Sequence, residues 1–245
     1  MKLIIDGGNT VIKIAVFEGV KCVFKLKSDY SLWYENLKKI TTQYPKVEKG
    51  ISSLVSAVDQ KRLELFFEKN NIEYVSLSYE TAIPFKNLYQ TPSTLGVDRI
   101  ALMASAVSRF KNKNCLVIDA GSCITYDFIN SDSEYYGGTI SLGLQMRYKS
   151  LNEFTAKLPM LSPEYSNSFV GRTTDEAIHS GVCFALLTEI DGVIKYFSNK
   201  YPQMIVILTG GDADFLSKRL KNSIFVLPNF LIEGLNHILD YNTNK

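Results

Sequence analysis

A strand-turn-strand pattern that occurs twice constrains the fold of this chain more than any other feature. Residues 3–16 and residues 116–129 each contain an apolar strand, an Asp-x-Gly turn and a second strand, in that order. The two turns begin at Asp6 and Asp119, so nearly half of the chain separates them. An internally duplicated protein with two domains shows this kind of spacing.

The segments that follow the two turns also match in their order. After the first turn, the apolar patterns predict further strands and two helices, over residues 32–42 and 61–69. Broadly the same order follows the second turn, and it ends with an amphipathic helix that begins at Asn229. The sequence therefore predicts an α/β protein with two similar domains, residues 1–110 and residues 111–245.

The composition limits the classes of partner. The chain has 27 basic and 25 acidic residues, a net charge of +2, and no long run of like charges, so we expect no nucleic-acid partner. No segment approaches the roughly 18 apolar residues of a membrane-spanning helix. Asp6 also follows Met1 closely, which does not fit a secretion signal. We therefore expect a cytoplasmic protein with no membrane partner.

The first turn, Asp6 to Thr10, has the residue types of a phosphate-binding turn. Its glycines let backbone N–H groups approach phosphate oxygens, while Asn9 and Thr10 add donors. Asp6 can hold Mg²⁺ through water. The alternative is an ordinary type I′ hairpin, in which Gly-Asn is a common turn sequence.

The second turn, Asp119 to Ser122, repeats the carboxylate, the glycine and the hydroxyl. This recurrence in a matching context favours phosphate binding over two unrelated hairpins. A third glycine site, Thr209 to Asp212, ends an apolar strand, and we expect adenosine to lie across its bare backbone. No P-loop and no dinucleotide-binding glycine pattern occurs in the sequence.

Two α/β domains that each carry such a turn are similar to the actin/hexokinase-like (ribonuclease H-like) architecture, in which nucleotide lies in a central interdomain cleft. Four segments then resemble type III pantothenate kinase in type and order. They are Asp6–Thr10, Tyr89–Arg99, Asp119–Ser122 and Tyr136–Gly143, the last followed by Thr155–Pro159. The resemblance extends through Thr174 and Gly181 to Gly211, and Gly-Val-Asp-Arg at residues 96–99 is its most specific element.

This resemblance implies an enzyme that transfers the γ-phosphoryl group of ATP to pantothenate, giving 4'-phosphopantothenate in the first step of coenzyme A synthesis. It also implies a homodimer that uses Mg²⁺ and a monovalent cation, K⁺ or NH₄⁺. The implied ATP contacts are Asp6, Gly7, Gly8, Asn9, Thr10, Val11, Ile12, Lys13 and Ser122. The implied pantothenate contacts are Tyr89, Gly96, Val97, Asp98, Arg99 and Thr174.

The resemblance further implies three roles for carboxylates. Asp119 would bind the monovalent cation, Asp6 would hold Mg²⁺ through water, and Asp98 would accept the proton of the pantothenate hydroxyl. The sequence departs from the family pattern at Gly7, where an aliphatic residue is usual, and at Ser122, where threonine is usual. It also has Ser141-Leu142 where a proline commonly precedes the last glycine. None of these departures removes a functional group.

Asp98 and Arg99 can also be interpreted from their chemistry. An apolar helical face predicts a helix from Val97 on that leaves Asp98 and Arg99 off this face in the first turn. Asp98 could simply complement the helix dipole, but a cation at this end opposes the dipole. Arg99 therefore favours an anionic ligand, such as the carboxylate of pantothenate.

Other interpretations stay open. Lys13 fits either a phosphate contact or a solvated lysine, Tyr89 fits a core aromatic residue, and His179 fits a surface position better than a catalytic base. A kinase for another small hydroxylated acid or sugar would share both turns, but the segment from Tyr89 to Arg99 argues against it. A non-enzymatic, nucleotide-binding transcriptional accessory protein of the same fold would not need both Asp98 and Asp119.

Overall fold

A computed structural model describes residues 1–55, 58–166 and 168–243, and the chain divides into two compact units. Unit 1 comprises Met1–Lys111, Ser133–Tyr136 and Asn229–Lys245, and unit 2 comprises Asn112–Asp132 and Gly137–Pro228. The first boundary lies one residue from the division expected after residue 110. The C-terminal segment differs more, because it belongs to unit 1 and not to the second half of the sequence.

Unit 1 is built on a twisted sheet with the strand order β3-β2-β1-β4-β5. The strands are β1 (Lys2–Gly7), β2 (Ile12–Glu18), β3 (Lys21–Ser28), β4 (Lys49–Leu54) and β5 (Glu73–Ser76). β1 pairs antiparallel with β2 and parallel with β4, so the first repeated motif lies at the centre of this sheet. The predicted strand-turn-strand unit is therefore present.

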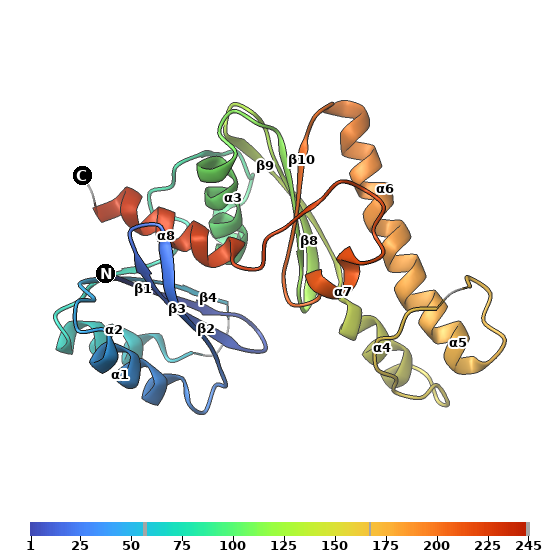
Figure 1. Ribbon diagram of the computed structural model, residues 1–245, viewed down its shortest axis with the longest axis horizontal. Coiled ribbons are helices and arrows are strands. Elements are labelled where there is room, and N and C mark those ends of the chain that lie inside the picture. Colours follow the sequence, from blue (N-terminus) through green and yellow to red (C-terminus); the bar gives the residue numbers. More distant parts are fainter. Residues whose placement is uncertain (56–57, 167, 244–245) are drawn as a thin grey trace. The chain divides into compact units, whose positions relative to one another are not determined.

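Helices cover both faces of this sheet (Figure 1). They are α1 (Trp33–Gln43), α2 (Gln60–Lys69), α3 (Val97–Arg109) and α8 (Phe230–Thr243). On one face, α1 and α2 pack with Leu3 and Ile5 in one apolar cluster. On the other face, α3 and α8 pack against each other and α8 also contacts β1 and β4. A Cβ on Gly234 of α8 would lie 1.8 Å from the Ala101 carbonyl oxygen, so the two helices touch through their backbones.

The second sheet has the order β11-β10-β7-β8-β9-β6 among the residues the structure describes. Its strands are β6 (Lys86–Asn87), β7 (Cys115–Ala120), β8 (Cys123–Ile129), β9 (Glu134–Leu142), β10 (Ile205–Thr209) and β11 (Phe225–Val226). β7 and β8 form the second repeated hairpin, and β10 lies parallel to β7. β6 pairs with the first two residues of β9, Glu134 and Tyr135, which are part of unit 1.

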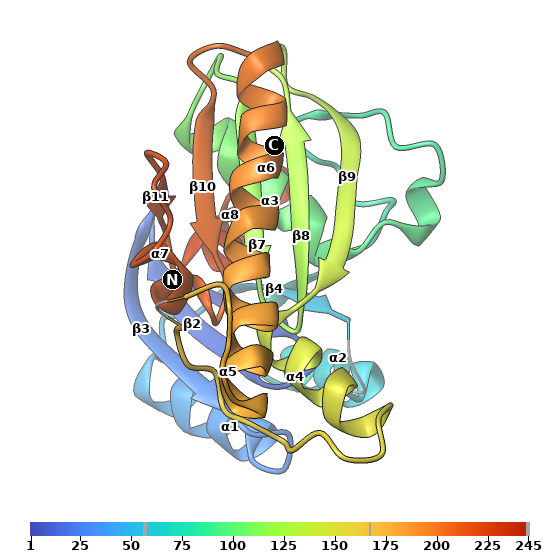
Figure 2. The same cartoon turned by 90° about the vertical axis from the view of Figure 1, so that its right-hand side faces the viewer.

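The helices of unit 2 are α4 (Leu144–Glu153), α5 (Thr174–His179), α6 (Ala185–Lys200) and α7 (Ala213–Ser217). One π-helical turn, Ser180–Phe184, joins α5 and α6, so the continuous helical stretch from Thr174 to Lys200 contains a local irregularity. In Figure 2 the long helix α6 runs along the sheet of this unit.

The expectation that no segment approaches the length of a membrane-spanning helix was wrong, because the helical stretch Thr174–Lys200 is long and apolar enough to cross a membrane by length and composition alone. Its buried apolar side chains, among them Leu186, Ile190 and Ile194, belong to the core cluster of unit 2. Glu189, in the middle of this stretch, forms an ion pair with Arg147. The stretch therefore has the contacts of a core helix in a folded unit.

Candidate active site

The first turn places a buried carboxylate beside a lysine. Asp6 is 3% exposed, and Lys13, its partner across the hairpin, has its Nζ 2.9 Å from Asp6 Oδ2. Lys13 is therefore held against the turn and is not simply a solvated lysine. Asn9 and Thr10 are exposed at the tip of the turn, and the Tyr30 hydroxyl donates a hydrogen bond to the Gly8 carbonyl.

The two hydrophobic residues of the predicted ATP segment, Val11 and Ile12, are less exposed than Asn9 and Thr10. Ile12 is fully buried among the core residues of unit 1, and Val11 is half-buried. The carbonyl of Gly7 accepts a hydrogen bond from the N–H of Val55 on the neighbouring chain segment. Any contact of Ile12 with nucleotide must therefore come from its backbone, whereas Asn9 and Thr10 can offer side chains.

Ser53 lies beside Asp6 and was missed by the sequence analysis. It is the residue of β4 that pairs with Asp6 in the parallel register, and it is 1% exposed. Within the described part of the chain, its Oγ has no hydrogen-bond partner. Side chains alternate between the faces of a sheet, so Asp6 lies on the face opposite Ile5, where α3 and α8 pack. The adjacent serines Ser52 and Ser53 of this strand look alike in the sequence, so the sequence gives no signal of this position.

The start of α3 brings Gly96, Asp98 and Arg99 together. The Asp98 Oδ1 atom accepts a hydrogen bond of 2.8 Å from the backbone N–H of Arg99. A Cβ on Gly96 would lie 2.4 Å from the same oxygen, so a larger residue at this position would displace the Asp98 carboxylate. The carboxylate is thus held at the first turn of the helix by the backbone N–H of Arg99.

Arg99, which the sequence places off the apolar face of α3, is nevertheless buried. It is 5% exposed, and the residues from Arg99 to Ala106 are all buried. α3 packs against both α8 and β4, so it has no single apolar face. The Arg99 guanidinium lies over the Tyr89 ring at 5.7 Å, and this ring stacks nearly parallel to Tyr135 at 6.4 Å. Tyr89 therefore links an arginine to the aromatic core.

The second turn and the third glycine site form one structure in unit 2. β7 and β10 pair in parallel, with Asp119 opposite Thr209, so their carboxyl ends lie together. Gly210 has φ of +97°, and a Cβ on it would lie 2.3 Å from the Ala120 carbonyl oxygen and 2.5 Å from Asp119 Oδ1. The backbone N–H of Asp212 donates to the same Ala120 carbonyl at 2.9 Å. The third glycine site thus fits closely around the second turn, which its sequence alone did not indicate.

A further glycine completes this arrangement. Gly143 precedes α4, and a Cβ on it would lie 2.2 Å from the Ser122 carbonyl oxygen and 2.4 Å from that of Gly121. Gly211, in contrast, has no described atom within 4 Å of a built Cβ. The second turn is therefore enclosed by backbone on two sides, and the bare backbone at Gly211 stays open.

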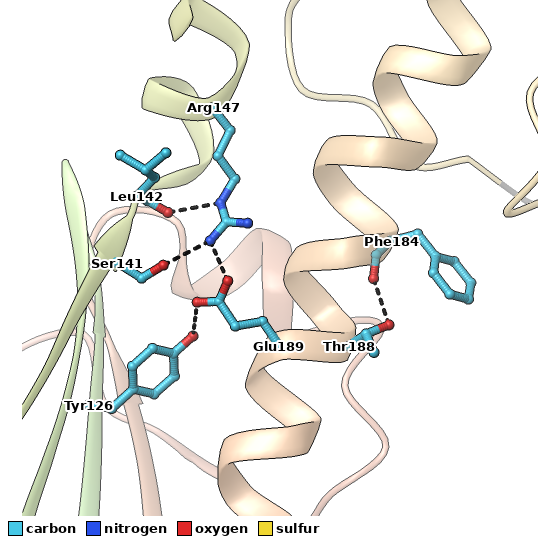
Figure 3. Close-up of polar contacts among 7 residues, drawn as sticks. All are labelled: Tyr126, Ser141, Leu142, Arg147, Phe184, Thr188 and Glu189. Carbon is cyan, nitrogen blue, oxygen red and sulfur yellow. Dashed lines mark hydrogen bonds and ion pairs between the residues drawn. The ribbon is translucent and has the colours of Figure 1, made fainter. Parts of the chain in front are cut away.

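A polar network lies next to Gly143 (Figure 3). Arg147 of α4 donates from Nε to the Leu142 carbonyl at 2.9 Å and from Nη2 to Ser141 Oγ at 3.1 Å. Its Nη2 also lies 2.5 Å from Glu189 Oε2, and the Tyr126 hydroxyl donates to Glu189 Oε1 at 2.8 Å. No local pattern in the sequence indicates this network, because its members come from four separate elements of unit 2.

Two other residues considered from the sequence also lie in unit 2. Thr174 is exposed in the first turn of α5, where the Thr173 side chain caps the helix by accepting from the Glu176 N–H. His179 was expected at the surface, but it is half-buried, and its Nδ1 lies 2.8 Å from the Tyr148 hydroxyl. The contact with Tyr148 explains why His179 is half-buried, since a ring nitrogen with a hydrogen-bond partner does not need water.

A family model described as type III pantothenate kinase matches residues 2–196 of the chain. The chain belongs to the type III pantothenate kinase family. A relative of this name from Christiangramia forsetii is 46% identical over 248 residues, which is 100% of each chain. Another from Flavobacterium johnsoniae is 42% identical over 98% of each chain. The match covers at least 98% of both of these relatives.

Solved structures identify the fold of this type III pantothenate kinase as actin/hexokinase-like, as predicted. A Campylobacter jejuni protein assigned to a Baf family of transcriptional activators has a TM-score of 0.63 at 23% identity, over 99% of this chain and 100% of its own. A Listeria monocytogenes protein assigned as an N-acetylmannosamine kinase has a TM-score of 0.57 at 11% identity, over 98% and 99% of the two chains. At these identities the likeness concerns the fold alone.

The predicted site residues of this type III pantothenate kinase divide between the two units. Unit 1 holds the turn Asp6–Thr10 with Lys13, together with Tyr89 and the segment from Gly96 to Arg99. Unit 2 holds Asp119, Ser122 and Thr174. Within unit 1 the structure links Asp6 to Lys13 and Tyr89 to Arg99. The roles of all these residues remain predictions.

Proposed function

We propose that this type III pantothenate kinase transfers the γ-phosphoryl group of ATP to the hydroxyl group of pantothenate, in the first step of coenzyme A synthesis. The proposal depends most on the start of α3. There Gly96 leaves room for the Asp98 carboxylate, and the neighbouring Arg99 is buried over the Tyr89 ring. A carboxylate beside a buried guanidinium can orient a hydroxyl and bind the anionic end of one small acid.

The phosphates of ATP are proposed to bind at the two glycine turns. In the first turn, the backbone of Gly7 and Gly8 with the exposed Asn9 and Thr10 supplies donors, and Lys13 supplies a positive charge. In the second turn, Ser122 is exposed and its hydroxyl would add another contact. Phosphoryl transfer depends mostly on such positioning and on charge neutralisation.

Each of the two turns offers one aspartate for a metal ion, Asp6 in the first turn and Asp119 in the second. Among the described residues, no cluster of three His, Cys, Asp or Glu side chains could hold a metal ion. This agrees with Mg²⁺ held by the phosphates, by water and by a single carboxylate, for which we propose Asp6. For the monovalent cation, K⁺ or NH₄⁺, we propose Asp119, which is half-buried at the end of β7. Bound Mg²⁺ would neutralise charge on the phosphate oxygens.

The chemistry assigned to the chain is orientation and proton removal. Asp98 would accept a hydrogen bond from the pantothenate hydroxyl and take its proton late, as the hydroxyl oxygen bonds to the γ-phosphorus and ADP leaves. Arg99 and Tyr89 would hold the carboxylate and amide groups of pantothenate, with further contacts from Val97 and Thr174. The hydrogen bond from the Arg99 N–H to Asp98 would keep the carboxylate in its place.

Two other functions are compared with pantothenate phosphorylation. The Campylobacter jejuni protein of the same fold is assigned to a family of transcriptional activators, so a regulator that binds nucleotide without turnover is one alternative. A kinase for another small acid or sugar is the other. The segment from Tyr89 to Arg99, which resembles the pantothenate-binding segment of the family, favours pantothenate over an uncharged sugar.

The proposal is tested by measuring ADP release from purified protein with ATP and Mg²⁺. Pantothenate is compared with glucose, glycerol and acetate, each with and without potassium or ammonium ions. We expect turnover with pantothenate alone, increased by the monovalent cation. Turnover on glucose but not on pantothenate would reject the assignment, and nucleotide binding without ADP release in any mixture would favour the regulator.

We also propose that the enzyme is a cytoplasmic homodimer. Several apolar side chains of unit 2 are exposed, among them Ile140 at 65%, Phe184 at 43% and Tyr196 at 66%. Where exposed apolar side chains form one contiguous patch, the patch often marks a surface that a partner covers. Sedimentation of the purified protein should give twice the mass of one 27.6 kDa chain. A single-chain mass at micromolar concentration would contradict the dimer and leave the kinase assignment intact.

A further inference from the structure

Arg147 holds the end of β9 in a fixed conformation. It lies in the first turn of α4, where its backbone N–H bonds to the Gly143 carbonyl at 3.0 Å. From there its guanidinium reaches back and donates to the Leu142 carbonyl and to Ser141 Oγ (Figure 3). The two residues that precede Gly143 are therefore fixed by one planar side chain, whose donors have a set geometry.

Glu189 fixes the guanidinium from the other side. Its Oε2 accepts from Arg147 Nη2 at 2.5 Å, and its Oε1 accepts from the Tyr126 hydroxyl at 2.8 Å. Burial alone would raise the pKa of Glu189, but the hydrogen bonds from Arg147, Tyr126 and Ser141 outweigh it and lower this pKa below its ordinary value. Burial and the bond to Glu189 raise the pKa of Tyr126, so tyrosine stays the donor.

The segment that Arg147 fixes lies against the second turn. Gly143 follows Leu142 directly, and its backbone is so close to Gly121 and Ser122 that no Cβ would fit there. Tyr126 also lies on β8, the returning strand of the same hairpin, and pairs with Ile118, the residue before Asp119. The network therefore contacts the hairpin of the second turn both through Gly143 and through β8.

We propose that Arg147 is a positioning residue for the turn from Asp119 to Ser122. Arg147 acts through Leu142 and Gly143 and does not touch ATP itself. The inference rests on the proposed function, in which this turn binds the phosphates and the monovalent cation. Loss of the Arg147 contacts lets Gly143 move, and the carbonyl groups of Gly121 and Ser122 then move with it.

A purely structural ion pair would have different consequences. Arg147 and Glu189 side chains are 17% and 29% exposed, and the desolvation of such a pair offsets much of its Coulombic attraction. A structural role predicts a lower melting temperature, with unchanged kinetic constants for the molecules that still fold. A positioning role predicts a weaker affinity for ATP and for the monovalent cation, with an unchanged KM for pantothenate.

The test compares Arg147→Lys and Arg147→Ala with Lys149→Ala, an exposed residue on the same helix, as matched control. Lysine keeps the charge but not the planar set of donors. We expect both Arg147 variants to raise the KM for ATP and the half-saturating K⁺ concentration about tenfold, because small misplacements of contact groups cost this much or more. The control should match the wild type, and guanidinium ions should partly restore Arg147→Ala.

A second variant tests the network separately from the arginine. Glu189→Gln should show the same effect on the KM for ATP in smaller degree, and the double variant should be no worse than Arg147→Ala, because both changes break one network. An unchanged KM for ATP in both Arg147 variants would overturn the inference. If Arg147→Ala fails to fold, the KM values for ATP of Arg147→Lys and Glu189→Gln test the inference.

The design separates failure of the inference from failure of the proposed function. If the wild-type chain does not phosphorylate pantothenate, the proposed function fails, and binding of a fluorescent ATP analogue then measures the effect of Arg147. Weaker binding in Arg147→Lys but not in Lys149→Ala supports the positioning role. Equal binding in both variants removes it, whatever the wild-type activity.

Discussion

The Asp98→Asn variant should phosphorylate pantothenate at least about 100-fold more slowly than the wild-type chain, with the KM for ATP changed less than about twofold. Asparagine keeps the oxygen that accepts from the Arg99 N–H, so the start of α3 should keep its geometry. It cannot take the proton of the pantothenate hydroxyl. Steady-state kinetics with each substrate varied in turn measure both constants.

A matched control is available at Asp59, the N-cap of α2 in the same unit. Its side chain accepts from the backbone N–H of Arg62 at 3.0 Å, so it also serves a helix start. Asp59→Asn should leave kcat unchanged, because this carboxylate has only a capping role. If Asp98→Asn has wild-type kcat, Asp98 has no part in proton transfer and serves only as such a helix-start acceptor.

The Gly210→Ala variant should lose about 2 to 4 kcal/mol of stability, since it combines a strained backbone with overpacking. Gly210 has φ of +97°, and the added methyl group would lie 2.3 Å from the Ala120 carbonyl oxygen and 2.5 Å from Asp119 Oδ1. The turn at Asp119 must then shift. Urea unfolding gives the change in stability, and the K⁺ dependence of activity reports the shift at Asp119.

The neighbouring glycine provides the control. At Gly211 a built Cβ has no described atom within 4 Å, and its φ is not in the left-handed region. Gly211→Ala should therefore change the free energy of unfolding by less than about 0.5 kcal/mol, as surface substitutions usually do. Equal stability of the two variants would show that the close fit around the second turn is not as tight as described.

The sequence predicted the local structure well because the signals were local. The repeated hairpins lie within residues 3–16 and 116–129, and both were found as adjacent antiparallel strands. The helices predicted over residues 32–42 and 61–69 are present as α1 and α2, shifted by one residue at most. Apolar spacing along a short segment contains this information.

Features that depend on tertiary packing were not predictable in this way. The apolar face of α8 was visible in the sequence, but such a face does not specify which sheet it covers, and α8 proved to pack in unit 1. The helical pattern of α3 likewise placed Arg99 off the apolar face, and it did not indicate that Arg99 is buried in a helix that packs against both α8 and β4. Arg147 and Glu189 are 42 residues apart, and no local pattern links them.

The division of unit 1 into three chain segments bears on the order in which the protein is completed during synthesis. Unit 2 has all of its residues once Pro228 has been added, whereas unit 1, which begins the chain, still lacks α8. Until that helix emerges from the ribosome, β1 and β4 lack their contacts with α8. Synthesis of unit 1 therefore begins first and is completed last. A nascent chain released before α8 is made would expose an apolar sheet face that is prone to aggregation.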